Sequence, residues 1–111
     1  MPSVTEEMIN DTVSVIVRRT RPEAIILFGS QASGKAGPHS DIDLIVIESA
    51  SFSQGNDRRR EMTRLWQALA KFPVPRDILV YSRDEVERWR DARNHVIAKA
   101  LKEGRFLYGT L

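Results

Sequence analysis

Residues at helical spacing form a stripe near the N-terminus of the chain. Ser3 and Glu6 stand ahead of it at the spacing of a capping box. The stripe consists of Met8, Ile9, Thr12, Val13, Ile16 and Val17. We therefore expect an amphipathic helix that ends near residues 19–21, before Pro22.

Three apolar runs predict β-strands. Residues 24–28 are continuously apolar between Pro22 and Gly29, which is typical of a buried strand. Residues 41–48 are rich in β-branched side chains, and residues 77–81 form a third run. The second and third runs each begin with a carboxylate, Asp41 and Asp77.

The second half of the chain also contains helical patterns. One helix is expected through to Phe72, and a second capping-box spacing, Ser82 with Glu85, begins a helical region that is broken near Asp91 and stopped by Gly104. Residues 106–108 form a short closing segment. The apolar positions at helical spacing are Met62, Leu65, Trp66 and Leu69, then Val86, Trp89, Val96, Ile97, Ala100 and Leu101. We assign the tryptophans and methionines to the core.

These elements predict an α/β (α+β) fold with a small mixed sheet covered by helices. A length of 111 residues suits one domain, residues 1–111. The hydrophobic share of 41% and charged share of 29% are those of a globular protein.

Composition excludes several function classes. The chain has no cysteine, which excludes disulfides, thiolate zinc sites and a Cys nucleophile. No apolar run reaches the ~20 residues that span a bilayer, and the N-terminus is acidic where a secretory signal is basic, so we expect a cytoplasmic protein.

The net charge of +2 is too small by itself to argue for direct nucleic-acid binding. Arginines nevertheless crowd the segment with Arg58, Arg59, Arg60 and Arg64. We interpret this run as a solvated helix face, with a surface for an acidic partner or RNA as the alternative.

The carboxylates carry the first candidate chemistry. Side chains alternate along a strand, so Asp41 and Asp43 are expected on one face, where their mutual repulsion favours a divalent cation. Oxygen ligands favour Mg²⁺ or Mn²⁺. If Asp77 lies on a neighbouring strand, three carboxylates can hold two ions for an in-line displacement at a nucleotide α-phosphate, with Asp77 as the general base.

A glycine-rich segment supplies the second half of the predicted site. Gly29 permits close approach of backbone N–H groups to phosphate, the Ser30 hydroxyl adds a hydrogen bond, and Lys35 adds a positive charge. A phosphate-binding loop of the NTPase type is the alternative. Ala36 lacks the hydroxyl that this loop needs for Mg²⁺, and Pro38 would break the following helix.

Together these motifs resemble the signature of the DNA polymerase β-like nucleotidyltransferase superfamily. The matching residues are Phe28-Gly29-Ser30 and, after a spacer, Ser40-Asp41-Ile42-Asp43-Leu44. Asp77 stands where that family has its third carboxylate, and residues 100–108 are similar to its C-terminal helix and tail. The short length resembles its minimal nucleotidyltransferase branch.

The resemblance implies an activity and a partner. Members of this branch often act as antitoxins in hetero-oligomers with a ribonuclease toxin of the HEPN type, and the implied activity is Mg²⁺-dependent transfer of AMP from ATP to a tyrosine of that toxin. Gln31 and Ser33 stand where the family commonly has arginines. The alternative is therefore a non-catalytic binding module of the same fold that neutralises its partner by contact.

Overall fold

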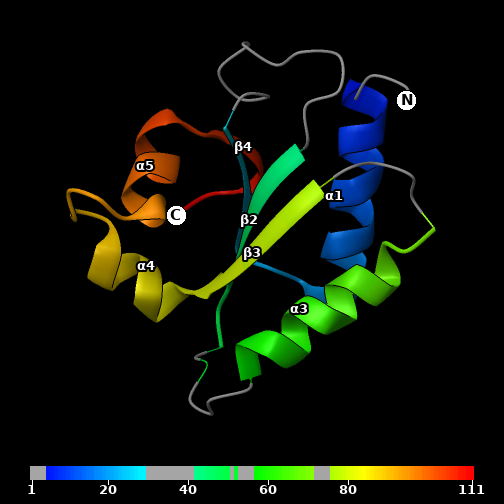
Figure 1. Ribbon diagram of the computed structural model, residues 1–111, viewed down its shortest axis with the longest axis horizontal. Helices are drawn as coiled ribbons and strands as arrows, with labels where there is room; N and C mark the ends of the chain where they lie inside the picture. Colours follow the sequence, from blue (N-terminus) through cyan, green and yellow to red (C-terminus); the bar gives the residue numbers. More distant parts are fainter. Residues whose placement is uncertain (1–4, 30–41, 51, 53–56, 72–75) are drawn as a thin grey trace.

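The computed structural model describes residues 5–29, 42–50, 52, 57–71 and 76–111. Its elements confirm the predicted order of helices and strands (Figure 1). They are α1 (Glu6–Thr20), β1 (Ala24–Phe28), β2 (Ile42–Glu48), α3 (Asp57–Ala68), β3 (Arg76–Ser82), α4 (Arg83–Trp89), α5 (Val96–Glu103) and β4 (Arg105–Gly109).

The four strands form one mixed sheet in the order β3-β2-β1-β4. β1 is antiparallel to both of its neighbours, β2 and β4, whereas β2 and β3 are parallel. The strand predicted to carry Asp77 therefore lies beside the strand that carries Asp43. The C-terminal segment, expected only as a closing segment, is an edge strand.

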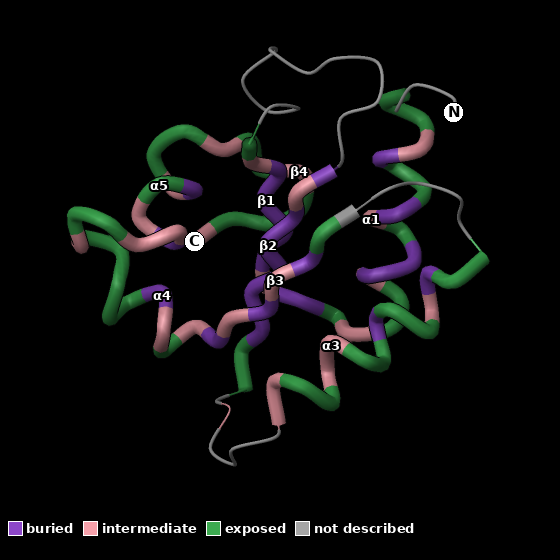
Figure 2. The backbone as a smooth tube through the Cα atoms, viewed as in Figure 1, coloured by how far each residue is buried: buried purple, intermediate pink, exposed green. Residues whose placement is uncertain are grey.

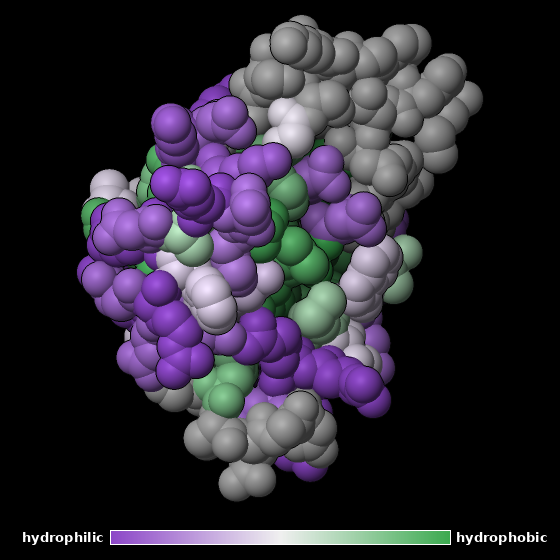
Figure 3. Space-filling view, turned by 60° about the vertical axis from the view of Figure 1, so that its left-hand side comes forward, coloured by the Kyte–Doolittle hydropathy of each residue, from purple (hydrophilic) through white to green (hydrophobic). Residues whose placement is uncertain are grey.

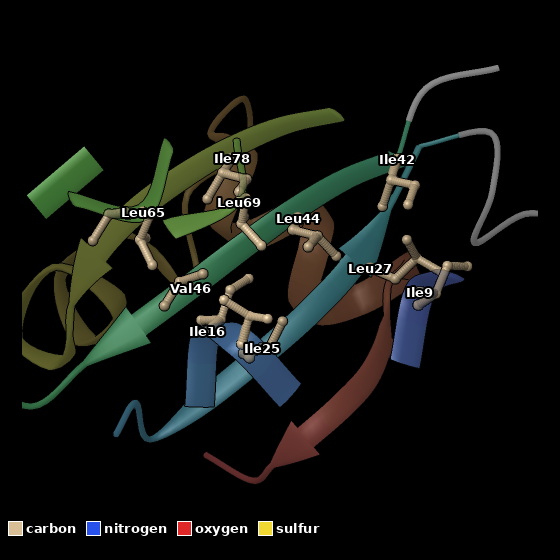
Figure 4. Packing of buried hydrophobic residues seen from close by; sticks show 12 residues of the cluster. Ile9, Ile16, Ile25, Leu27, Ile42, Leu44, Val46, Leu65, Leu69 and Ile78 are labelled. Atoms are coloured by element: carbon tan, nitrogen blue, oxygen red, sulfur yellow. The ribbon is translucent and has the colours of Figure 1, made fainter. Parts of the chain in front are cut away.

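Helices cover both faces of this sheet, with α1 and α3 on one face and α4 and α5 on the other (Figure 1). The buried positions follow the strands through the centre of the molecule (Figure 2). Strand alternation divides the apolar side chains into two clusters. The cluster under α1 and α3 includes Ile16, Leu27, Leu44, Leu65 and Ile78 (Figure 4). The cluster under α4 and α5 includes Ile26, Ile45, Ile47, Val86 and Ile97.

Helix α1 begins later than the spacing of Ser3 and Glu6 predicts. Its N-cap is Thr5, whose hydroxyl accepts a hydrogen bond from the backbone N–H of Met8 at 3.1 Å. Threonine satisfies an unpaired N–H of the first turn as serine would, so the spacing alone did not identify the cap. The expected end is confirmed, because Arg21 caps the helix in the left-handed conformation, with φ of 49°.

Both tryptophans were wrongly assigned to the core. The exposed fraction is 44% for Trp66 on α3 and 37% for Trp89 at the end of α4. The buried stripe of α3 passes through Leu65 instead, and Leu69 just beyond the helix is also buried. By contrast, Met8 and Met62 pack against the core cluster as predicted.

The second predicted capping box is confirmed at the start of α4. The hydroxyl of Ser82 accepts from the Glu85 backbone N–H, and the Glu85 carboxylate accepts from the Ser82 backbone N–H at 3.0 Å. Burial alone would raise the pKa of Glu85, but hydrogen bonds from Arg58 and from the Ser82 backbone hold that pKa below its usual value.

The arginine run divides between two roles. Arg59 and Arg60 are exposed, as expected of a solvated helix face. Arg58 is half-buried, pairs with Glu85, donates to the carbonyl oxygen of Val80 at 3.2 Å and lies 5.1 Å from the ring centre of Tyr81. Arg58 therefore joins α3 to β3 and α4.

Within the described ranges, no helix has the length and apolar composition that crossing a bilayer would require.

Candidate active site at the edge of the sheet

The end of β1 and the starts of β2 and β3 meet at one edge of the sheet. Phe28 pairs with Asp43 in the antiparallel ladder, and Asp43 pairs with Asp77 in the parallel ladder. Phe28, Asp43 and Asp77 therefore form one row across three strands. We call these three residues the edge row.

Alternation along the strands shows which face of the sheet the edge row occupies. Asp43 lies two and four residues before Ile45 and Ile47, which are both buried in the cluster under α4 and α5. Asp77 lies two and four residues before Leu79 and Tyr81, which pack against the same cluster, so Asp77 lies on that face too. Paired positions on neighbouring strands share a face, so the two carboxylates lie side by side on the side of α4 and α5.

Gly29 follows the edge row directly and touches it. Its φ is +76°, a left-handed conformation that glycine adopts without steric cost. A Cβ atom added to Gly29 would lie 2.5 Å from Oδ2 of Asp43. The Asp43 carboxylate therefore packs directly against the Gly29 backbone, and a side chain at position 29 would displace it.

A cavity of about 740 Å³ opens next to Gly29 on the same face. It extends from the end of β1 to the residues that precede α5 and along α5 itself. Its described lining consists of Phe28, Gly29, Asn94, His95, Val96, Lys99, Ala100 and Glu103. Figure 3, seen from the side of α4 and α5, shows polar side chains over these helices and apolar ones in the recess beside them.

Sequence reasoning missed this cavity and its polar residues, among them His95. His95 is half-buried and is the N-cap of α5, where its Nδ1 accepts from the backbone N–H of Ile97 at 3.1 Å. Its ring stacks on Trp89 with 4.6 Å between ring centres. The break near residue 91 was the available signal, because a helix that restarts needs a cap.

A sequence profile described as Polymerase beta, Nucleotidyltransferase matches residues 10–110. The chain belongs to this nucleotidyltransferase family. The matched region contains the edge row, Gly29 and the cavity. A search among curated protein sequences gave no match.

Solved structures share the nucleotidyltransferase fold with this chain. A proposed nucleotidyltransferase from Sulfolobus solfataricus has a TM-score of 0.63 and 18% identity, over 93% of this chain and 78% of that chain. A toxin–antitoxin structure with AMP-PNP has a TM-score of 0.53 and 22% identity, over 91% and 73% of the two chains. The toxin–antitoxin MntA–HepT has a TM-score of 0.50 and 19% identity, over 95% and 74%.

The nucleotidyltransferase family implies a divalent metal ion, and the edge row fits one. Asp43 is half-buried and Asp77 is exposed, so oxygen ligands are presented from two neighbouring strands to a position open to solvent. Such donors suit Mg²⁺ or Mn²⁺. In the described part of the chain, no three His, Asp or Glu side chains come together. A third carboxylate would have to come from elsewhere.

Three of the predicted site residues, Ser30, Lys35 and Asp41, lie outside the described residues. The predicted loop over 29–40 lies outside them too, apart from Gly29. The structure thus brings together Gly29, Asp43 and Asp77 of the predicted set.

Proposed function

We propose that this nucleotidyltransferase transfers AMP from ATP to a hydroxyl group of a protein partner. The pairing of Asp43 with Asp77, against the backbone of Gly29 and beside a cavity, carries the proposal. Asp41, two residues before Asp43, would complete a set of three carboxylates. These carboxylates would hold Mg²⁺, which supplies charge neutralisation for the phosphates and a lowered pKa for a bound hydroxyl.

The chain's own groups have separate roles in this reaction. Gly29 and Ser30 bind the phosphates through backbone N–H groups and a hydroxyl, and Lys35 adds a positive charge. The acceptor oxygen forms a bond to the α-phosphorus while the bond from that phosphorus to the bridging oxygen breaks. Pyrophosphate leaves, and Asp77 takes the proton of the acceptor hydroxyl. Asp43, packed against Gly29, holds its carboxylate in a fixed position beside the phosphates.

We further propose that the partner is a ribonuclease toxin of the HEPN type and that the modification neutralises it. Two observations support this: the sequence resembles the minimal nucleotidyltransferase branch, and solved toxin–antitoxin structures, one of them with AMP-PNP, share the fold. On this proposal the chain works in a hetero-oligomer with the toxin, and ATP is its substrate.

Calorimetric titration of ATP, with and without Mg²⁺, tests the site without needing the partner. We expect Mg²⁺-dependent binding by the wild type, and loss of that dependence in Asp43→Asn and Asp77→Asn. Lys35→Ala should weaken binding but keep the dependence. If both aspartate variants bind ATP as the wild type does, the carboxylates do not form the site. If no form binds ATP, a module that acts by contact is favoured.

A further inference from the structure

Helices α1 and α3 carry a cluster of exposed arginines that the proposed reaction does not use. Two lie in the last turn of α1 and three lie on α3. We call these five residues the arginine surface: Arg18, Arg19, Arg59, Arg60 and Arg64. We propose that the arginine surface binds a single-stranded nucleic acid, by contacts to its phosphates and by stacking of a base on Trp66. The two helices cover the face of the sheet opposite to the edge row, so this binding is independent of nucleotide transfer (Figure 1).

Three adjoining hollows connect the arginines of this surface. The first, of about 410 Å³, lies between α1 and α3 and is lined by Arg19 and Ala68 among others. The second, of about 210 Å³, shares both of these residues and adds Arg64. The third, of about 550 Å³, shares Arg64 and continues along α3 to Arg59 and Arg60. A row of hollows with shared walls suits an extended chain better than a compact ion.

The arginine surface has little negative charge of its own. Among the described residues, four of its five arginines form no ion pair, and Arg64 pairs with Glu61, whose side chain is only 13% exposed. Four arginines elsewhere pair with glutamates: Arg58, Arg83, Arg90 and Arg105. Like charges gathered on one surface repel one another, so an anion from outside the chain is the natural partner.

The small net charge of the chain conceals this asymmetry. Five of its 17 basic residues lie on the arginine surface, so the remainder of the chain has 12 basic residues against 15 acidic ones. The positive charge is therefore local, and a polyanion would be attracted to this surface rather than to the molecule as a whole.

Arginine and tryptophan together favour nucleic acid over an acidic protein as the partner. All five charges are guanidinium groups, which bind a phosphate through two parallel hydrogen bonds and also stack on flat rings. Trp66 is 44% exposed and lies three and seven residues after Thr63 and Arg59, on the side of α3 that lines the third hollow. A basic groove with an aromatic ring for stacking is how proteins bind single strands of nucleic acid. The carboxylates of an acidic protein would supply charge but no base for the Trp66 ring.

Arg64 holds the two helices of the arginine surface together. One of its terminal nitrogens donates to Glu61 at 2.9 Å, and the other donates to the carbonyl oxygen of Arg19 at 3.1 Å. The end of α1 is thereby tied to the middle of α3. The spacing between the arginines of the two helices is set before a ligand arrives, which lowers the entropic cost of binding.

Matched double substitutions test the inference. Arg19→Gln with Arg60→Gln removes two charges from the arginine surface, whereas Arg88→Gln with Arg93→Gln removes two exposed charges on the side of α4 and α5. Trp66→Ala removes the ring and leaves the charge unchanged. Fluorescence anisotropy at several salt concentrations measures binding of labelled oligouridylate and oligothymidylate, each of about 16 nucleotides. Labelled polyglutamate serves as the probe for an acidic protein.

We expect the wild type to bind at least one of the two oligonucleotides, with an affinity that falls as salt rises. Each phosphate contact to a single strand contributes about 0.7 to the slope of log affinity against log salt. Arg19→Gln with Arg60→Gln should therefore lower that slope by about 1.4 and weaken binding at least about tenfold, while the control pair binds as the wild type does. Trp66→Ala should weaken binding about fivefold or more at an unchanged slope, because stacking releases no counterions.

Several results would overturn the proposal. These are a wild type that binds neither oligonucleotide, equal affinities of the two double variants, and a Trp66→Ala variant that binds as the wild type does. Binding of polyglutamate without binding of either oligonucleotide would also overturn it and would favour an acidic protein partner. Mg²⁺-dependent ATP binding by the wild type and its loss in Asp43→Asn do not depend on any of these results, so this inference and the proposed function can fail separately.

Discussion

Gly29 shows how one backbone conformation connects the fold to the site. Its positive φ lets the chain leave β1 while the Asp43 carboxylate packs against its Cα atom. A side chain here would be strained by the left-handed conformation and would also collide with Oδ2 of Asp43. Stability and carboxylate position therefore depend on the same residue.

Gly29→Ala should lower the free energy of unfolding by about 1–2 kcal/mol, the usual cost of a left-handed non-glycine residue. It should also weaken Mg²⁺-dependent ATP binding, because the Asp43 carboxylate has to move. Urea unfolding and calorimetry measure the two effects. Unchanged ATP binding by a folded Gly29→Ala variant would show that the contact between Gly29 and Asp43 is unimportant for the site.

Glu48, at the end of β2, is a buried carboxylate far along the strand from the edge row. Burial, followed by the hydrogen bond and charge of Glu61, raises the pKa of Glu48 to about 8, and Arg64 opposes this shift. Oε2 of Glu48 has no hydrogen-bond partner among the described residues. The folded protein therefore favours the protonated form.

Stability should consequently fall as the pH rises from about 4.5 to about 8, because the folded state binds a proton at Glu48 that the unfolded state has lost. The slope for one proton is at most about 1.4 kcal/mol per pH unit. Glu48→Gln should remove most of this slope and be more stable than the wild type at pH 8. Urea unfolding at several pH values measures this dependence, with Glu7→Gln, a change at an exposed residue, as the control. If the free energy of unfolding of Glu48→Gln falls with pH as steeply as that of the wild type, another group causes the pH dependence.

At the scale of elements, helix α3 shows that helical periodicity alone does not predict which residues are buried. Leu65 and Trp66 both fit the helical period, but Leu65 is fully buried under the sheet and Trp66 is 44% exposed. The helical period predicts which residues share one side of a helix. The width of the buried stripe depends on how the helix packs against α1 and the sheet.

Leu65→Ala should therefore cost about 2–5 kcal/mol of unfolding free energy, as expected when a buried leucine leaves a cavity. Trp66→Ala should cost about 1 kcal/mol or less, because Trp66 is 44% exposed and lies outside the buried cluster. Chemical denaturation of the two variants makes the comparison directly. Equal losses would mean that Trp66 belongs to the core after all.

The strands were more predictable from the sequence than the helix boundaries. Strands β1, β2 and β3 are each a continuous or β-branched apolar run with a clear break at its end, so residues 24–28 were predicted as the structure has them. Several residue types can serve as a cap, and the exposed face of a helix depends on contacts from distant parts of the chain. Thr5 rather than Ser3 caps α1, and the closing segment becomes a strand by pairing with β1, about 80 residues earlier in the chain.

At the scale of the molecule, the two parts of the candidate site differ in how far the sequence predicts them. Sequence reasoning allowed Asp77 to join Asp43 if their strands were neighbours, and the parallel ladder shows that they are. The cavity could not be predicted, because its walls come from β1 and from α5, which are about 70 residues apart in the sequence and meet only through packing on the sheet.

The two faces of the sheet differ in what they carry. The face under α1 and α3 carries the larger apolar cluster, whereas the face under α4 and α5 carries Asp43, Asp77 and the cavity at one end. On the proposed function, nucleotide and acceptor approach from the edge of the sheet that carries Asp43 and Asp77.

The most direct test of the central claim is transfer of label from ATP carrying a radioactive α-phosphate to a protein partner that co-purifies with the chain from its native source. We predict that the partner becomes labelled in the presence of Mg²⁺ by the wild type, and that labelling is lost with Asp43→Asn and with Asp77→Asn, while complex formation is kept. Equal labelling by the wild type and both variants would contradict the catalytic role of the edge row. A partner that the wild type binds and neutralises without labelling would contradict nucleotide transfer itself.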